Sequence, residues 1–187
     1  MILDKKKLLK IKGDASFREF YRKKEKSKTS IIIFSKKEKR KNLLIYDAIN
    51  KILTQNNLIA PKLINQNYHQ NFIEVNDLGR MTALDHIKKS KNKFLVFKKI
   101  IDLLIKLQNI RTRRIKNFQN KLYNIPIYKN KLLFNEAKLF CEWYVPENLK
   151  KNRIKINKKL KLEIKNLLNN LKLKNNIIVH RLSLIHI

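Results

Sequence analysis

Cys141 is the only cysteine of the chain, and its neighbours determine what its thiol can do. A single cysteine can form neither an intrachain disulfide nor a cysteine-based zinc site. It lies in the mostly apolar run Leu139-Phe140-Cys141-Glu142-Trp143, where a thiol packs as a small hydrophobic group. We therefore expect Cys141 to be a buried structural residue and not a nucleophile.

The most numerous chemically active side chains are basic. Lys and Arg number 45 against 14 acidic residues, which gives a formal charge of +31 at pH 7. Such a charge usually indicates nucleic acid or an anionic surface as partner. However, Ile, Lys and Asn make up roughly 45% of the chain, and their A/T-rich codons are a sufficient cause of the bias.

The distribution of the charge also argues against dedicated nucleic-acid binding. Basic residues are spread from Lys5 to Lys174 between apolar segments, whereas phosphate contacts need a focused basic face with stacking aromatic residues. A basic nucleic-acid-binding protein and a non-catalytic helical interaction domain therefore remain the alternative functions.

Length and composition indicate a folded protein. The 187 residues, 43% of them hydrophobic, suffice for one ordinary domain or two small lobes. No apolar run reaches 18 residues, and residues 1–13 lack the apolar core of a signal peptide. We expect a soluble, cytoplasmic protein without a membrane span.

The first part of the chain predicts strands around one helix. Residues 17–21 and 30–34 are rich in aromatic and β-branched side chains and predict a β-hairpin. Apolar positions at helical spacing predict a helix over 39–56 with a stop at Asn56-Asn57. Residues 62–67 and 71–76 predict two more strands, and the pattern ends at Asp77-Leu78-Gly79.

Beyond Gly79 the pattern becomes mainly helical, up to about residue 173. Three apolar stripes at helical spacing occur in residues 97–107, 133–144 and 160–171, and Pro146 closes the second. A short strand at 177–179 then leads into His180-Arg181. The predicted fold is α+β: a β-rich lobe with one helix in residues 1–79, then a helical lobe in 80–181, in the order of a bilobal kinase.

Four motifs resemble one family when their order and spacing are taken together. They are Gly13-Asp14-Ala15-Ser16-Phe17-Arg18-Glu19-Phe20-Tyr21-Arg22, Asp77-Leu78-Gly79, Leu139-Phe140-Cys141-Glu142-Trp143-Tyr144 and Val179-His180-Arg181. The chain resembles the aminoglycoside phosphotransferase family, in the branch of sugar kinases that phosphorylate the anomeric hydroxyl of N-acetylmuramate and N-acetylglucosamine. The resemblance spans residues 11–181 and implies a bilobal protein-kinase-like fold that uses ATP and Mg²⁺.

The resemblance also implies a nucleotide site. In such kinases the first hairpin closes over ATP, so Gly13, Asp14, Ala15, Ser16 and Phe17 would offer backbone N–H groups to the phosphates. The alternative is an ordinary tight turn. The connector at Glu74, Val75 and Asn76 would run past the adenine. The resemblance predicts the position of this connector and not its side-chain contacts.

The phosphate-binding lysine of such kinases lies on the third strand and pairs with an acid of the next helix. Here Lys36 or Lys37 could serve only if the strand extends that far, and the acid could be Asp47 or Glu38. The alternative is that both lysines are solvated surface charges.

The catalytic loop is where the chain departs from the family. His180 and Arg181 begin the pattern His-Arg-Asp-x-His-x-x-Asn, but Leu182 stands in place of the aspartate. Residues 182–187 also match the in-frame translation of a transposon end, so we expect a non-native tail on an inactive N-terminal fragment. The alternative is a natural pseudokinase-like terminus. The sequence leaves the acceptor substrate and the oligomeric state open.

Overall fold

A computed structural model describes residues 8–11, 18–25, 28–127, 129–148, 153–171 and 177–178. The described residues form two compact units. The first comprises the chain up to Asn124 together with Ile178, and the second runs from Ile125 to Ile177. The candidate site lies in the first unit.

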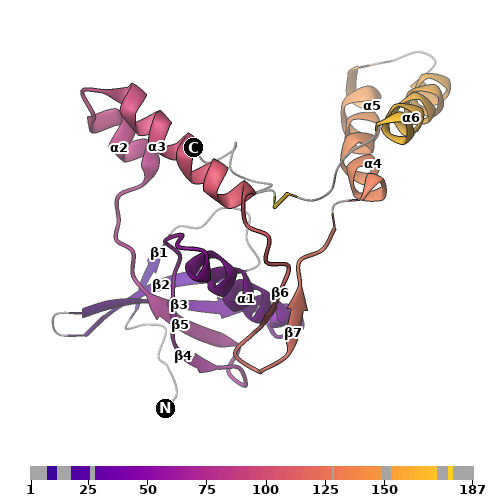
Figure 1. Cartoon of the computed structure of the whole chain (residues 1–187). Helices are drawn as coiled ribbons and strands as arrows, with labels where there is room; N and C mark the ends of the chain where they lie inside the picture. Colours follow the sequence, from indigo (N-terminus) through magenta and orange to yellow (C-terminus); the bar gives the residue numbers. More distant parts are fainter. Residues whose placement is uncertain are drawn as a thin grey trace. The chain divides into compact units, whose positions relative to one another are not determined.

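A five-stranded antiparallel sheet forms the first unit's framework (Figure 1). Its strands are β1 (Leu9–Ile11), β2 (Arg18–Glu25), β3 (Lys28–Ser35), β4 (Leu63–Asn67) and β5 (Phe72–Asn76), in the order β1-β2-β3-β5-β4. The β2–β3 hairpin pairs over its full length from Arg18 with Ser35 to Glu25 with Lys28. The predicted hairpin, the two later strands and the antiparallel sheet within residues 8–76 are confirmed for the described residues.

Alternation along the strands gives the sheet two apolar faces. One face carries a buried cluster of Ile33, Ile73 and Val75 that packs with Leu43 of the following helix. The other face carries Tyr21, Ile32 and Phe72, with Phe34 against them. Because neighbouring residues point to opposite faces, the paired residues Phe20 and Ile33 lie on the first face.

Helix α1 (Lys41–Gln55) follows a 3₁₀ turn, η2 (Lys37–Lys39), and contacts β3 and β6. Its end agrees with the predicted stop, because Asn56 caps it and Asn57 has a positive φ of 59°. The turn between β4 and β5 also uses asparagine: Asn71 has a φ of 59°, a backbone region that asparagine tolerates better than most residues.

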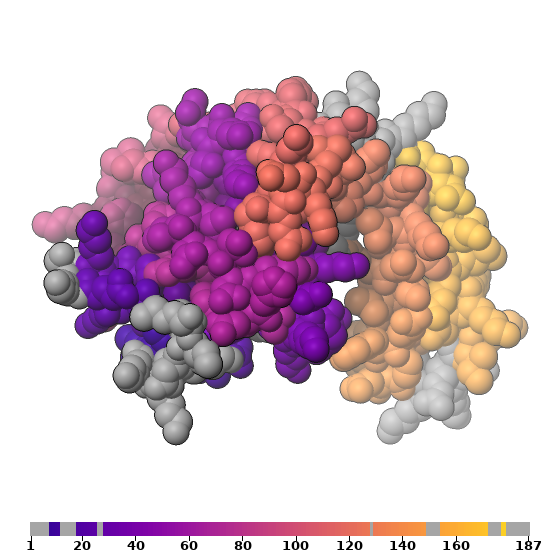
Figure 2. Space-filling view, turned by 90° about the horizontal axis from the view of Figure 1, so that it is seen from below, coloured from indigo at the N-terminus to yellow at the C-terminus, as the bar shows by residue number. Residues whose placement is uncertain are grey.

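The first unit continues with helices α2 (Ala83–Lys89) and α3 (Lys93–Gln108), which pack against each other, and with a small hairpin of β6 (Arg114–Lys116) and β7 (Leu122–Asn124). The hairpin was not predicted, and it corrects the expectation of mainly helix across this region. Figure 2 shows it beside the sheet segments, where the Phe118 ring lies 6.0 Å from that of Tyr68.

The second unit is helical, as predicted. It contains α4 (Asn130–Leu139), a π-helical turn, η3 (Phe140–Tyr144), α5 (Val145–Asn148) and α6 (Arg153–Asn170). Cys141 is a fully buried free thiol, which confirms its predicted burial, and its carbonyl accepts a hydrogen bond from Asn157 Nδ2. The strand expected at 177–179 is not formed at Ile177 and Ile178, and Val179 lies outside the described residues.

Candidate functional site

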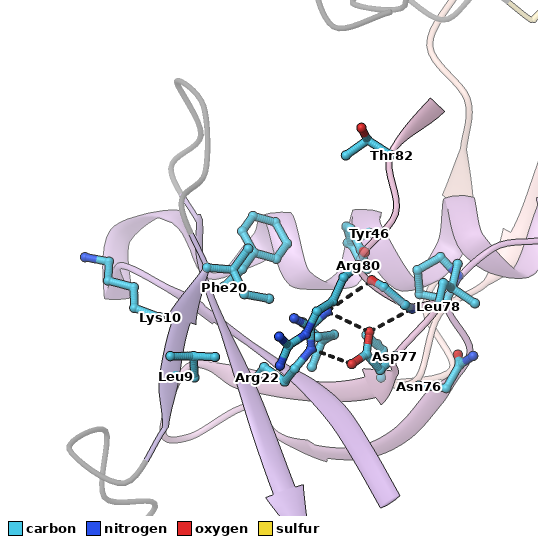
Figure 3. A pocket seen from close by; sticks show the side chains of 15 residues that line it. Leu9, Lys10, Phe20, Arg22, Tyr46, Asn76, Asp77, Leu78, Arg80 and Thr82 are labelled. Atoms are coloured by element: carbon cyan, nitrogen blue, oxygen red, sulfur yellow. Dashed lines mark hydrogen bonds and ion pairs between the residues drawn. The ribbon is translucent and has the colours of Figure 1, made fainter. Parts of the chain in front are cut away.

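A cavity of about 500 Å³ opens on the α1 side of the sheet (Figure 3). Strands β1, β2, β3 and β5 contribute its apolar walls, including Phe20, Ile31 and Val75. Tyr46 of α1, Pro61 and the segment that follows β5 also line the cavity. The cavity is lined mainly by apolar groups, with the polar or charged side chains of Lys10, Arg22, Asn76, Asp77, Arg80 and Thr82 among them, and its size is that of a small-molecule site.

An ion pair between β2 and the segment after β5 lies within this cavity. Arg22 Nε is 2.5 Å from Asp77 Oδ2, and Arg22 Nη2 is 3.0 Å from Asp77 Oδ1 and 3.0 Å from the Gly79 carbonyl. Both side chains are buried. The hydrogen bonds from Arg22 hold the pKa of Asp77 down to about 2, and the same pair raises the pKa of Arg22.

Gly79 lets the chain turn at the end of this segment. Its φ is +105°, a conformation that residues with a Cβ rarely adopt, and its backbone N–H donates to Asp77 Oδ1 at 3.0 Å. Asp77-Leu78-Gly79 thus ends β5 and fixes the connector against Arg22. The predicted break in the pattern at this tripeptide is confirmed.

Arg18 brings a second cation to the same face of β2. Its guanidinium lies 5.0 Å from the Tyr46 ring centre and 5.9 Å from that of Phe20, within the range of cation–π contacts. Burial lowers the pKa of Arg18 and raises that of Tyr46. The spacing of two residues between Arg18, Phe20 and Arg22 places all three on one face of the strand. This alternation is visible in the sequence, but it was not among the predicted site features.

The predicted phosphate-binding lysines lie elsewhere. Strand β3 ends at the buried Ser35, and the exposed Lys36 and Lys37 follow in the turn that leads to α1. The cavity lining includes neither lysine. Their expected acidic partners also differ in setting: Glu38 is exposed, whereas Asp47 is buried and pairs with Lys51 at 3.0 Å.

The predicted connector residues divide between the two faces of the sheet. Val75 and Asn76 line the cavity, and the Asn76 side chain accepts a hydrogen bond from the Lys62 backbone. Glu74 is directed to the opposite face, where its carboxylate accepts from Ser30 at 2.5 Å and lies 3.4 Å from Lys23. Residues 13–17 and His180 and Arg181 lie outside the described residues.

The described residues contain no cluster of three or more His, Cys, Asp or Glu side chains that could hold a metal ion. None of the helices described is both long and apolar enough to cross a membrane.

Comparison with known proteins identifies two bacterial kinases. An N-acetylmuramate/N-acetylglucosamine kinase of Pseudomonas putida is 30% identical over 137 residues, which are 73% of this chain and 37% of that kinase. The kinase of the same name from Pseudomonas aeruginosa is 24% identical over 142 residues, 76% of this chain and 39% of that kinase. The chain is a distant homologue of these two kinases. It spans less than two fifths of their length, and no family model matches it.

Proposed function

We propose that the chain is the nucleotide-binding part of an ATP-dependent phosphotransferase that phosphorylates a hydroxyl of a small molecule, an amino sugar such as N-acetylmuramate or N-acetylglucosamine. The observation that carries this proposal is the similarity to two kinases with those substrates in their name, over about three quarters of the chain. The bilobal kinase-like fold, the division near residue 79 and the use of ATP and Mg²⁺ are parts of the same proposal.

The cavity supports a nucleotide site of this kind. An adenine ring is flat and apolar on both faces, so it would lie against Phe20, Ile31 and Val75, while the connector's backbone would meet its polar edge. The Arg22–Asp77 pair would then hold the connector in position. Residues 13–17, which precede β2, would cover the phosphates with backbone N–H groups.

Phosphoryl transfer itself requires groups that this sequence does not supply after Arg181. The family pattern has an aspartate directly after His-Arg, and this residue accepts the proton of the attacking hydroxyl. Leu182 cannot accept a proton, and residues 183–187 contain no acid. Magnesium would neutralise phosphate charge in the reaction, but the described residues include no cluster of acidic, His or Cys side chains that could hold it. The 187-residue chain would therefore bind nucleotide without turning it over.

Equilibrium dialysis of the chain against labelled ATP and labelled adenosine tests the proposal. Saturable binding of both, with mutual competition, is the expected result, because adenine and ribose would occupy the cavity in each case. The matched control is Leu78→Ala combined with Phe20→Ala, which removes apolar walls and should weaken both ligands alike. Failure of the unmodified chain to bind either ligand at millimolar concentration would contradict the proposal.

A further inference from the structure

The charged side chains that line the cavity do not balance one another. They are Lys10, Arg22, Asp77 and Arg80, three cations and one acid. Arg22 and Asp77 form the buried ion pair, so their charges cancel within the lining. Lys10 and Arg80 are both exposed, and the lining contains no second acid to offset them. The mouth of the cavity therefore carries a positive charge that suits an anionic group of a ligand.

Strand register directs one of these two cations, Lys10, to the other face of the sheet. Lys10 pairs with Tyr21 of β2, and directly opposed residues share a face. Tyr21 belongs to the apolar cluster on the face away from α1. In Figure 3 the amine of Lys10 accordingly points away from Arg22 and Asp77. Lys10 thus borders the cavity without directing its charge into it.

Arg80, the other cation, is attached to backbone that hydrogen bonds hold in place. On one side of it, the Gly79 carbonyl accepts from Arg22 at 3.0 Å. On the other side, Thr82 begins α2 with a capping box in which Asp85 takes part. Because the backbone is fixed both before and after Arg80, its side chain starts from a defined position at the cavity.

The guanidinium of Arg80 is available to a ligand. Arg80 is exposed, and within the part of the chain that the structure describes its side chain has no hydrogen-bond, ion-pair or aromatic partner. The next acid along the chain, Asp85, instead accepts from the Thr82 N–H and hydroxyl, at 3.0 and 2.7 Å. A guanidinium presents several N–H donors in one plane and can bind two oxygens of a phosphate at once.

We propose that Arg80 binds a phosphate group of the nucleotide at the mouth of the cavity, while the base lies against the apolar walls. The inference rests on the proposed function, since it requires a nucleotide in the cavity. It assigns the phosphate-binding cation to the connector after β5, and not to the exposed Lys36 and Lys37, which do not line the cavity.

The experiment measures the ratio of ATP affinity to adenosine affinity by equilibrium dialysis of the whole chain, without Mg²⁺ and at constant ionic strength. Arg80→Met keeps the apolar stem of the side chain but removes the charge, and it should lower the ratio roughly fivefold. Arg80→Lys keeps a charge without the planar fork and should give an intermediate ratio. The matched controls are Lys36→Met and Lys37→Met, made singly. Each removes one exposed cation outside the lining and should change the ratio less than about twofold.

The controls separate a phosphate contact from long-range attraction. The chain's charge of +31 attracts ATP whichever side chain contacts it, and loss of one cation weakens this general attraction in each Met variant. Partial unfolding lowers the affinities for ATP and adenosine by the same factor, so it leaves the ratio unchanged.

Two results would overturn the inference while the proposed function stood: an unchanged ratio in Arg80→Met, or an equal or larger loss in either lysine variant. Absence of adenosine binding in the unmodified chain would instead refute the proposed function, and this inference with it.

Discussion

Arg22 and Asp77, 55 residues apart in sequence, join the second strand to the connector after the fifth by two hydrogen bonds of 2.5 and 3.0 Å. Arg22 also donates to the Gly79 carbonyl, so one side chain binds two residues of the connector. The pair is buried within the cavity, where a lone charge would be costly. Several expected outcomes depend on it.

Asp77→Asn should destabilise the first unit by about 3 kcal/mol, because it leaves the buried guanidinium of Arg22 without its counter-charge. The measurement is the free energy of unfolding from urea titration followed by circular dichroism. Asp102→Asn, which changes an exposed acid of α3, is the matched control and should shift the value by less than about 0.5 kcal/mol. Equal effects of the two substitutions would show that the pair contributes little.

The Arg22–Asp77 pair should also give the protein an acid-sensitive component of stability. The pKa of Asp77 is lowered in the folded chain from its ordinary 3.8 to about 2, so the unfolded chain binds its proton first as the pH falls. The contribution is thus complete above pH 3.8 and is lost as the pH falls toward about 2. The stability difference between the unmodified chain and Asp77→Asn should shrink across this window. A difference that stays constant to pH 2 would contradict the assignment.

Gly79→Ala should destabilise the connector by about 1–2 kcal/mol, because its φ of +105° is strained for any residue with a Cβ. Space is not the cause, since no atom lies within 4 Å of an added Cβ. Gly79→Asn should cost less, because asparagine tolerates positive φ better than alanine. Thermal unfolding checks the ranking, and an alanine variant as stable as the parent would refute it.

Exposed apolar side chains on the helices of residues 82–171 should make this segment a poor folding unit. Phe94 is 74% exposed, Trp143 74% and Ile154 70%, values that are high for large hydrophobic residues. Limited proteolysis should cut within residues 82–171 before it cuts the strands of residues 18–76. A compact, protease-resistant core formed by residues 82–187 would contradict this prediction.

The 187-residue chain should consume no ATP in the presence of N-acetylmuramate or N-acetylglucosamine, because Leu182 stands where the resembled family has its catalytic aspartate. A chimera that carries the Pseudomonas putida kinase sequence from position 182 onward should regain turnover, measured as ADP release. Metal-dependent phosphorylation of such a sugar by the unmodified chain, lost on mutation of Lys36, Lys37 or Asp14, would refute this account.

Local patterns were sufficient to predict most elements of the first unit. The β2–β3 hairpin, α1 and the strands around Asn71 each have a periodicity or a turn residue within a few positions of sequence. The hairpin β6–β7 was missed because strands of three residues are too short to show a period of two. Its turn contains Asn117 and Asn120, and these two turn-favouring asparagines were the signal available in the sequence.

The sequence by itself determined most of the elements, the break at Gly79 and the similarity to kinases, because these depend on neighbouring residues or on motif order. Only the tertiary structure decided which charges meet. In the structure Arg18 is paired with Ser35, and strand β3 ends at Ser35, before Lys36. Pairing of Arg22 with Asp77 depends on strands that lie 55 residues apart in the chain. Such long-range contacts have no local signature, because a lysine or arginine has the same propensities whether solvent or a buried carboxylate surrounds its charge.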